Sequence, residues 1–319
     1  MTDRPAVRWG FLGAGFVASR GVGPAVHAAD GAVLQAVAAR DVARAESLAP
    51  VRATTSYAEL CEADDVDAVY ISLPNDDHLP WVERAVATGK AVLCEKPLGR
   101  DALEVARMTA AAHGHEALLV EASWNRWHPR TRRVEELLDD VAGELDVRAW
   151  FTFPGVPEDN YRLDPARGGG AMLDVGCYAV AAAQIALGDD VVVTAAEQHA
   201  GPTGVDLTTS AALASARGVA RVTGSFEQDE SQGWVVTTAG LVVDVPHPAF
   251  TSWREESTLR VVEDGVERVE TFAACDAYEL MVEAVSARVA GEDAWVLPLS
   301  TSLSVARTLD AITEVARQA

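Results

Sequence analysis

The first 122 residues alternate short apolar runs with polar segments of helical length. Strands that are apolar at nearly every position, rather than at every second one, are typical of a parallel sheet buried on both faces. Helices between such strands indicate a doubly wound α/β fold. The predicted strands are residues 6–12, 33–38, 67–73, 91–94 and 117–121, and the predicted helices are 16–28, 41–49, 57–60, 79–88 and 101–113.

The pattern changes near residue 123, where strands begin to dominate. We therefore expect two domains, a dinucleotide-binding domain at 1–122 and a substrate-binding and dimerisation domain of α+β class at 123–319. The second domain should contain a large, mainly antiparallel sheet, with Asp264-Gly265 as a hairpin turn. Its predicted helices are 129–140, 170–187, 276–290 and 302–317, and its predicted strands are 145–153, 191–198, 207–215, 219–226, 233–245, 259–263 and 266–271.

Composition narrows the function classes. With 26 Lys and Arg against 48 Asp and Glu, the net charge of −22 repels phosphate backbones, so we expect no nucleic-acid partner. No uncharged apolar run of about 18 residues is present, so no membrane span is expected. The start lacks an apolar signal core, and the four cysteines have no metal-binding spacing. These features are typical of a cytoplasmic protein with reduced thiols and no metal site.

A glycine turn follows the first strand. Gly13-x-Gly15-x-x-Ala18 connects that strand to a helix, as in the Rossmann dinucleotide-binding fold. The glycines allow the backbone to approach a pyrophosphate, which then sits on the helix N-terminus. The alternative is a plain strand-to-helix turn.

The end of the second strand bears on the choice of cofactor. NAD enzymes usually carry Asp or Glu there for the ribose hydroxyls. This chain has Ala39 at that position, followed by Arg40 and Arg44, two guanidiniums that suit a 2′-phosphate. We therefore predict NADP, with NAD as the alternative because Asp41 could serve a ribose hydroxyl. The two arginines could also be solvated surface charges.

Lys96 is one of only two lysines and follows a predicted parallel strand within Glu95-Lys96-Pro97. In open α/β sheets, ligands bind beyond the carboxyl ends of the strands. A lysine at such an end can donate to a substrate oxygen and lower the pKa of a neighbouring acid. The plain alternative is a solvated surface lysine.

Several motifs together give a more specific indication. The runs 89–99 (GKAVLCEKPLG), 73–78 (LPNDDH) and 168–178 (GGGAMLDVGCY), with the glycine turn, resemble the glucose–fructose oxidoreductase and inositol dehydrogenase (Gfo/Idh/MocA) family. The match covers essentially the whole chain, in order. Residues 121–129 and 38–44 are similar to the branch of dimeric dihydrodiol dehydrogenases and ketosugar reductases, which has tyrosine where other members have histidine. That branch uses NADP.

The resemblance implies a catalytic set of Lys96, Asp174 and Tyr178. Tyr178 exchanges a proton with the substrate oxygen, Lys96 polarises that oxygen and tunes Tyr178, and Asp174 orients substrate hydroxyls or Lys96. The spacing agrees, because Asp174 and Tyr178 are four residues apart on one predicted helix. Free tyrosine has a pKa of about 10, and a nearby ammonium lowers it. The alternatives are a tyrosine packed in the core and a buried, capping or salt-bridged aspartate.

Other residues are candidates for contacts with ligands. His78 is expected near the nicotinamide, or else as a residue that starts a helix. Trp124 and Arg126 are expected to line the substrate pocket, although tryptophans there could simply pack between domains. Arg162 lies in the long loop before Gly168, where it either binds substrate or pairs with Asp164. The expected cofactor contacts are Gly13, Gly15, Phe16, Val17, Arg40, Arg44, Leu73, Asn75, His78, Glu95 and Lys96; the expected substrate contacts are Trp124, Arg126, Arg162, Asp174 and Tyr178.

The favoured interpretation is an NADP-dependent oxidoreductase acting on a ketone or secondary alcohol of a carbohydrate-like small molecule. Its substrate would be a sugar, a ketosugar or a dihydrodiol-like alcohol. A dinucleotide-sensing regulatory protein on the same fold is the alternative, and retention of both Lys96 and Tyr178 favours catalysis. A family reductase with a flat aromatic substrate is a third interpretation. Because one face of the second sheet needs a partner, we expect a homodimer or larger homo-oligomer through that sheet.

Overall fold

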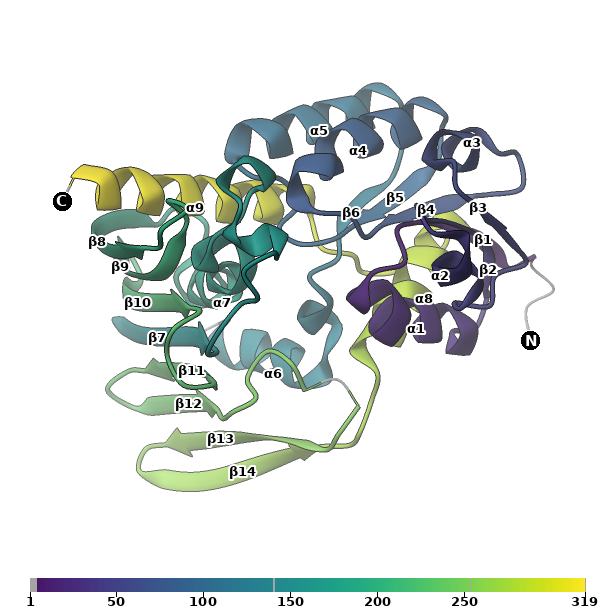
Figure 1. Ribbon diagram of the computed structural model, residues 1–319. Helices are drawn as coiled ribbons and strands as arrows, with labels where there is room; N and C mark the ends of the chain where they lie inside the picture. The colour runs from purple at the N-terminus through teal and green to yellow at the C-terminus, as the bar shows by residue number, and fades with distance from the viewer. Residues whose placement is uncertain (1–4, 140, 253, 319) are drawn as a thin grey trace. The chain divides into compact units, whose positions relative to one another are not determined.

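A computed structural model describes residues 5–139, 141–252 and 254–318 (Figure 1). The chain forms two compact units, and neither is a single stretch of sequence. The first unit comprises Met1–Gly99, Leu103–Trp127 and Asp276–Ser302, and the second comprises Arg100–Ala102, His128–Cys275 and Leu303–Ala319. The division at residue 122 stays a prediction, and the observed grouping differs from it by placing 276–302 with the first unit.

The first unit is built on a parallel sheet in the order β3-β2-β1-β4-β5-β6, the doubly wound order of dinucleotide-binding folds. Its central strands are buried throughout, which explains why they are apolar at nearly every position. The direction of the strand order reverses between β1 and β4. The strands are β1 (Val7–Leu12), β2 (Ala32–Ala38), β3 (Arg52–Thr54), β4 (Ala68–Ile71), β5 (Ala91–Cys94) and β6 (Leu119–Glu121).

Helices cover both faces of this sheet, as predicted. Figure 1 shows α4 and α5 on one side and α1 with α8 on the other. Apolar residues of α4 at Leu79, Val82 and Val86 lie at helical spacing and are buried. The helices of this unit are α1 (Gly23–Ala28), α2 (Val42–Glu46), α3 (Tyr57–Glu62), α4 (His78–Ala87), α5 (Ala102–Gly114) and α8 (Ala277–Val289).

Helix α8 belongs to the first unit although it follows the whole second sheet in sequence. The Trp9 indole nitrogen donates to the Ser286 hydroxyl at 3.0 Å, and both residues are buried. The Tyr278 ring stacks on Trp124 with centroids 4.5 Å apart. These partners are more than 150 residues apart, so no local pattern indicates them. Buried aromatic residues thus connect α8, which follows the second sheet, to segments that precede that sheet.

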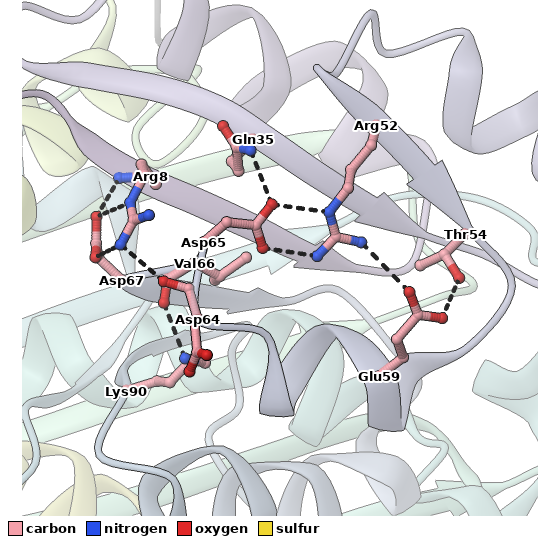
Figure 2. A network of polar contacts seen from close by, with 10 residues as sticks. All are labelled: Arg8, Gln35, Arg52, Thr54, Glu59, Asp64, Asp65, Val66, Asp67 and Lys90. Atoms are coloured by element: carbon pink, nitrogen blue, oxygen red, sulfur yellow. Dashed lines mark hydrogen bonds and ion pairs between the residues drawn. The ribbon is translucent and has the colours of Figure 1, made fainter.

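A polar network occupies the amino edge of the first sheet (Figure 2). Arg8 pairs with Asp67, and Arg52 donates two hydrogen bonds of 3.0 and 2.9 Å to Asp65. The buried Lys90 ammonium donates to the Val66 carbonyl at 2.9 Å. Ligands of such sheets bind at the opposite, carboxyl edge. Lys90 therefore has a structural contact, and a chemical role for Lys96 stays a prediction.

The second unit is built on a mainly antiparallel sheet in the order β14-β13-β12-β11-β7-β10-β9-β8, in which only the β7–β10 pairing is parallel among the described strands. Helices α6 (Pro129–Leu138), α7 (Cys177–Leu187) and α9 (Leu299–Gln318) pack on one face (Figure 1). The strands are β7 (Leu145–Thr152), β8 (Val192–Ala200), β9 (Asp206–Ser215), β10 (Gly218–Ser225), β11 (Ser231–Thr237), β12 (Leu241–Val245), β13 (Ser257–Glu263) and β14 (Val266–Phe272).

The other face of the second sheet carries exposed side chains. Along β7, Val147 and Ala149 are buried while Asp146 and Arg148 are exposed, and β10 alternates in the same way. Such alternation is expected where helices cover one face only. Association through this face stays a prediction. The stretch Pro165–Leu187 is long and apolar enough to cross a membrane, but 78% of its most apolar window is buried, as in a core helix.

Two details of the predicted fold were wrong. Strand β3 was missed because three half-buried residues give no periodic signal. The strand expected at 233–245 is a hairpin of β11 and β12, which turns at 238–240. Its apolar run hid the turn, since only Gly240 marks it. The predicted turn at Asp264-Gly265 is confirmed, with φ of +50° and +80°.

Candidate functional site

The glycine turn lies where the strand order of the first sheet reverses. Gly13 follows β1 and has a φ of +101°, which side-chain-bearing residues rarely adopt. A Cβ on Gly13 would lie 2.5 Å from the carbonyl oxygen of Ser72, which follows β4. The Gly13 amide donates to the Ala38 carbonyl at 2.9 Å, at the end of β2. The turn is therefore fixed between two strand ends, where open α/β sheets bind ligands.

Gly15 differs from Gly13 in its surroundings. The nearest described protein atom to a Cβ on Gly15 would be the Ser72 hydroxyl oxygen at 3.8 Å, an ordinary contact. Packing of the protein therefore does not require glycine here. Phe16 is 76% exposed and Val17 is half-buried. A π-helical turn follows at Ala18–Val22, a rare conformation that is frequent at functional sites.

Arg44 reaches the glycine turn directly. Its Nη2 atom donates at 2.8 Å to the carbonyl of Ala14, the residue between the two glycines in sequence. Arg40 and Arg44 both lower the pKa of Tyr57, whose net pKa is nevertheless raised by burial. Asp41 caps α2 by accepting from the Ala43 amide at 3.0 Å. Its carboxylate is thus engaged in helix capping, which weakens the case for Asp41 as the ribose ligand of NAD.

His78 connects the turn after β4 to the turn after β5. Its Nε2 atom lies 2.9 Å from the Leu73 carbonyl oxygen, and its Nδ1 atom lies 3.1 Å from that of Pro97. The ring is wholly buried, so it acts on the site through the two turns that it joins rather than through its own surface. Burial lowers the pKa of this histidine. Asn75, predicted as a cofactor contact, is buried in the same turn after β4.

Two buried carboxyl groups lie near Lys96: Glu95 precedes it in sequence, and Glu121 is the last residue of the neighbouring strand β6. Tyr70 donates from its hydroxyl to Glu95 at 2.7 Å, and Glu121 accepts from the Leu98 amide at 3.0 Å. Lys96 itself is half-buried and acts electrostatically on both carboxyls. Sequence reasoning missed Tyr70 and Glu121, because each sits within an apolar strand and only its partner reveals its role. Together they hold the turn that carries Lys96.

The raised pKa of Glu95 predicts a pH dependence of stability. Burial is the largest cause and raises the pKa from 4.5 to about 7. The unfolded chain releases this proton near pH 4.5, whereas the folded chain keeps it until about pH 7, so stability falls as pH rises across that window. Glutamine imitates the protonated carboxyl. In Glu95→Gln the free energy of unfolding should therefore fall less than in wild type as pH rises across this window, by about 3 kcal/mol. Urea unfolding at pH 5 and pH 8 measures both slopes.

The comparison of wild type with Glu95→Gln isolates Glu95, because burial also raises the pKa values of Glu121, Asp206 and Asp310, and those groups are the same in both proteins. The pKa values of Asp65 and Asp67 are lowered, mainly by hydrogen bonds from Arg52 and Arg8, so their contribution is lost only in more acidic solution. An Asp65→Asn variant is therefore a control that should keep the wild-type decline between pH 5 and pH 8. Equal declines in wild type and Glu95→Gln would contradict the assignment.

In the second unit, Arg162 and Asp174 form an ion pair. The Arg162 Nε atom donates to the Asp174 carboxylate at 2.7 Å. The alternative pairing with Asp164 was wrong, because Asp164 caps a short helix by accepting from the Ala166 amide. Asp174 lies in the π-helical turn Met172–Gly176, which leads directly into α7. Both glycine-containing motifs of the sequence therefore precede a π-helical turn.

Tyr178 is the second residue of α7 and is 8% exposed. Its ring packs against Phe151 and Phe250, with centroids 5.6 and 5.7 Å away, and those two rings also stack on each other at 6.2 Å. It also contributes electrostatically to Arg162. The second unit thus brings Arg162, Asp174 and Tyr178 together, while the first brings together the glycine turn, Arg44 and the turn that carries Lys96.

Trp124 and Arg126 are buried in the first unit. Trp124 stacks on Tyr278, and Arg126 helps to lower the pKa of Glu121, which burial nevertheless raises. Substrate contacts by these two residues stay predictions. No cluster of three or more metal-ligating side chains occurs among the residues that the structure describes.

Two known domain families match successive parts of the chain. Residues 7–123 match an oxidoreductase family with the NAD-binding Rossmann fold, and residues 131–242 match the Gfo/Idh/MocA C-terminal domain. The order of the two matches is the order predicted from the sequence motifs.

Individual relatives agree with these matches. A D-xylose 1-dehydrogenase (NADP(+)) of Haloferax volcanii is 37% identical over 317 residues, which cover 97% of each chain. A dTDP-3,4-didehydro-2,6-dideoxy-α-D-glucose 3-reductase of Streptomyces antibioticus is 38% identical over 192 residues, covering 59% of this chain and 58% of the relative.

A solved structure extends the similarity to three dimensions. The crystal structure of a 3-ketoreductase from Actinomadura kijaniata, in complex with NADP and TDP-benzene, is 29% identical, covers 97% of this chain and 98% of its own, and has a TM-score of 0.90. Structures of that ketoreductase include variants with one tyrosine or one lysine replaced. The chain therefore belongs to the Gfo/Idh/MocA family of oxidoreductases, as its sequence motifs indicated.

Proposed function

We propose that this protein is an NADP-dependent oxidoreductase that transfers hydride between the nicotinamide and a ketone or secondary alcohol of a sugar-like substrate. The observation that carries the proposal is the placement of Lys96. It follows β5 at the carboxyl edge of the parallel sheet, in a turn held by a hydrogen bond between His78 and the Pro97 carbonyl and by the Leu98 amide donating to Glu121. That edge is where such sheets bind ligands.

The residues of the first unit fit a dinucleotide. The bare backbone at Gly15 leaves space that a Cβ would fill, and the Arg44 guanidinium beside Ala14 supplies positive charge at the turn. Gly13 and Gly15 would receive the pyrophosphate, and Arg40 and Arg44 the 2′-phosphate. When bound, the nicotinamide supplies the hydride chemistry. The other proposed cofactor contacts are Phe16, Val17, Leu73, Asn75 and Glu95, and His78 supports the turns that carry some of them.

The two glycines should respond differently to alanine. Gly15→Ala is expected to weaken NADPH binding about tenfold or more with little loss of stability, because a methyl group occupies space meant for the ligand. Gly13→Ala should destabilise the fold itself, by about 1–3 kcal/mol, because of its positive φ and its contact with Ser72. Fluorescence titration with NADPH and urea unfolding separate the effects. Unchanged NADPH affinity in Gly15→Ala would argue against pyrophosphate binding at the glycine turn.

The arginines should set the preference between cofactors. Arg40→Ala is expected to weaken NADPH binding by about 1.5–3 kcal/mol, the size of a hydrogen bond to a charged group, and to leave NADH binding nearly unchanged. Affinities for both cofactors, measured with each variant, test this. Arg20→Ala is a suitable control, because it removes an exposed cation from the same unit. An intact preference for NADPH in Arg40→Ala would remove Arg40 from the site.

The proposed acid–base chemistry needs residues from both units. In the reducing direction, the ketone carbon accepts the hydride and its oxygen takes the hydroxyl proton of Tyr178, which leaves an alcohol and a phenolate; solvent then returns a proton to Tyr178. Lys96 donates a hydrogen bond to the same oxygen and favours the charge that develops there. Asp174 positions substrate hydroxyls or the cations around them. A tyrosine and a lysine are also replaced in crystallised variants of the Actinomadura ketoreductase.

The proposed substrate class is supported by the relatives and by the residues predicted as substrate contacts. Both sequence relatives are named for reactions of sugars or sugar nucleotides. Trp124, Arg126 and Arg162 would supply an aromatic surface and hydrogen-bond donors, which suit a sugar ring. We therefore propose a carbohydrate-like substrate, free or linked to a nucleotide.

NADPH consumption with a panel of ketosugars and aldoses tests the proposed function. Turnover of at least one carbohydrate, in preference to flat aromatic diols, is the expected result. Tight NADPH binding without turnover of any substrate, even at high enzyme concentration, would instead favour a protein that senses the dinucleotide.

A further inference from the structure

The backbone of Arg162 is fixed more firmly than its place in a long loop suggests. The Asn160 side chain accepts from the Arg162 amide at 3.0 Å, and the Arg162 carbonyl accepts from the Gly170 amide at 2.9 Å. A Cβ on Gly169 would lie 2.5 Å from that same carbonyl oxygen. The glycine run 168–170 therefore serves to seat Arg162 against the start of the helix that carries Asp174.

The side chain of Arg162 is fixed as well. Its Nε donates to Asp174 at 2.7 Å, and its guanidinium carbon lies 4.9 Å from the centre of the Tyr161 ring. The side chains of Arg162 and Asp174 are only 30% and 12% exposed. A guanidinium held by both a carboxylate and an aromatic face has little freedom to leave.

The ion pair places Arg162 beside the helical segment that carries Tyr178, because its partner Asp174 lies four residues before Tyr178 on the continuous segment 172–187. Burial lowers the pKa of Arg162, but Asp174, Tyr161 and Tyr178 raise it, and the net direction is upward. The interaction between the guanidinium and the phenol is mutual. A phenolate raises the pKa of the guanidinium, and the guanidinium in turn stabilises the phenolate. Phe151 and Phe250, which pack on the Tyr178 ring, bring no charge of their own.

We propose that Arg162, seated by the glycine run and held by Asp174, is a positioning residue whose positive charge stabilises the phenolate formed when Tyr178 gives up its proton. This inference rests on the proposed function of Tyr178 as the acid or base. Within the second unit, the titratable groups that act on Arg162 are Asp174, Tyr161 and Tyr178 itself, and Lys96 is the group proposed from the first unit. Without Arg162, the Asp174 carboxylate would lose its paired cation, and a carboxylate without that cation opposes a phenolate nearby.

The test is the pH profile of alcohol oxidation, in which Tyr178 must be deprotonated. Arg162→Met should move the midpoint of kcat/KM upward by about one pH unit, which is about a tenfold loss at any pH below the midpoint. Asp174→Asn should move the midpoint in the opposite direction, because it removes a negative charge and leaves the cation. Arg162→Lys should restore part of the wild-type midpoint.

Controls separate this inference from its alternatives. Arg167→Gln removes a guanidinium from the same loop and from the same Tyr161 ring, and it should leave the midpoint in place. An unmoved midpoint in Arg162→Met, with or without a raised KM, would overturn the inference and leave Arg162 only as the substrate contact already proposed. If Arg162→Met does not fold, Asp174→Asn alone tests the inference. An unmoved or raised midpoint of kcat/KM in Asp174→Asn would then overturn it. Full turnover in Tyr178→Phe would instead overturn the proposed function itself.

Discussion

Replacing Tyr178 with Phe is expected to lower turnover about 10²–10⁴-fold, the size of general acid–base catalysis, while NADPH binding stays intact. The reason is that only the hydroxyl is lost. The ring would still pack against Phe151 and Phe250, so the fold should change little. Steady-state rates of NADPH oxidation with a saturating ketosugar, together with NADPH titration, measure both quantities.

Two results would contradict this expectation for Tyr178. Turnover within a few-fold of wild type would mean that another group supplies the proton. A parallel loss of turnover and of thermal stability would mean that Tyr178 serves the core, where its ring is largely buried. A conservative control is Tyr161→Phe, which removes a hydroxyl from the neighbouring loop and should keep most of the activity.

Replacing Lys96 with Met is expected to have an effect of similar size. Methionine keeps most of the length of the side chain but cannot donate a hydrogen bond or stabilise charge on the substrate oxygen, interactions that are worth about 10²–10³ in kcat when one donor is lost. The loss should appear in kcat more than in NADPH affinity. Rapid mixing of enzyme–NADPH with substrate, followed at 340 nm, isolates the reductive step.

The other lysine offers a matched control. Lys90→Met removes the same charge from the amino edge of the same sheet, where the ammonium donates to the Val66 carbonyl (Figure 2). That variant should lose about 1–3 kcal/mol of stability, because a buried acceptor loses its donor, and should keep its kcat. Equal kcat values in Lys96→Met and wild type would remove Lys96 from the chemistry.

The sequence predicted the first sheet well because its strands are buried on both faces and its helices have a clear apolar side. What it missed depends on contacts between distant segments. Tyr278 of α8 stacks on Trp124, and nothing near residue 278 in the sequence indicates that partner. The short β3 has no apolar run of its own, and its place at the sheet edge comes from pairing with β2.

The candidate site shows the same contrast. Gly13, Lys96 and the glycine run 168–170 stand out in sequence because their conformation or chemistry is rare. The surrounding network does not stand out, since Tyr70 looks like a core residue until its hydroxyl is seen to reach Glu95. The partner of Arg162 was also beyond sequence reasoning, because proximity along the chain favours Asp164 while the fold of the loop selects Asp174.

The central claim is that an amine from one unit and a phenol from the other act on one substrate atom. The most direct measurement is a crystal structure with NADP and a bound alcohol or ketone. The account predicts that Lys96 Nζ and Tyr178 Oη each lie within about 3.2 Å of the same substrate oxygen, next to the reactive carbon of the nicotinamide. Either group turned away from that oxygen, with another acid or base in its place, would contradict it.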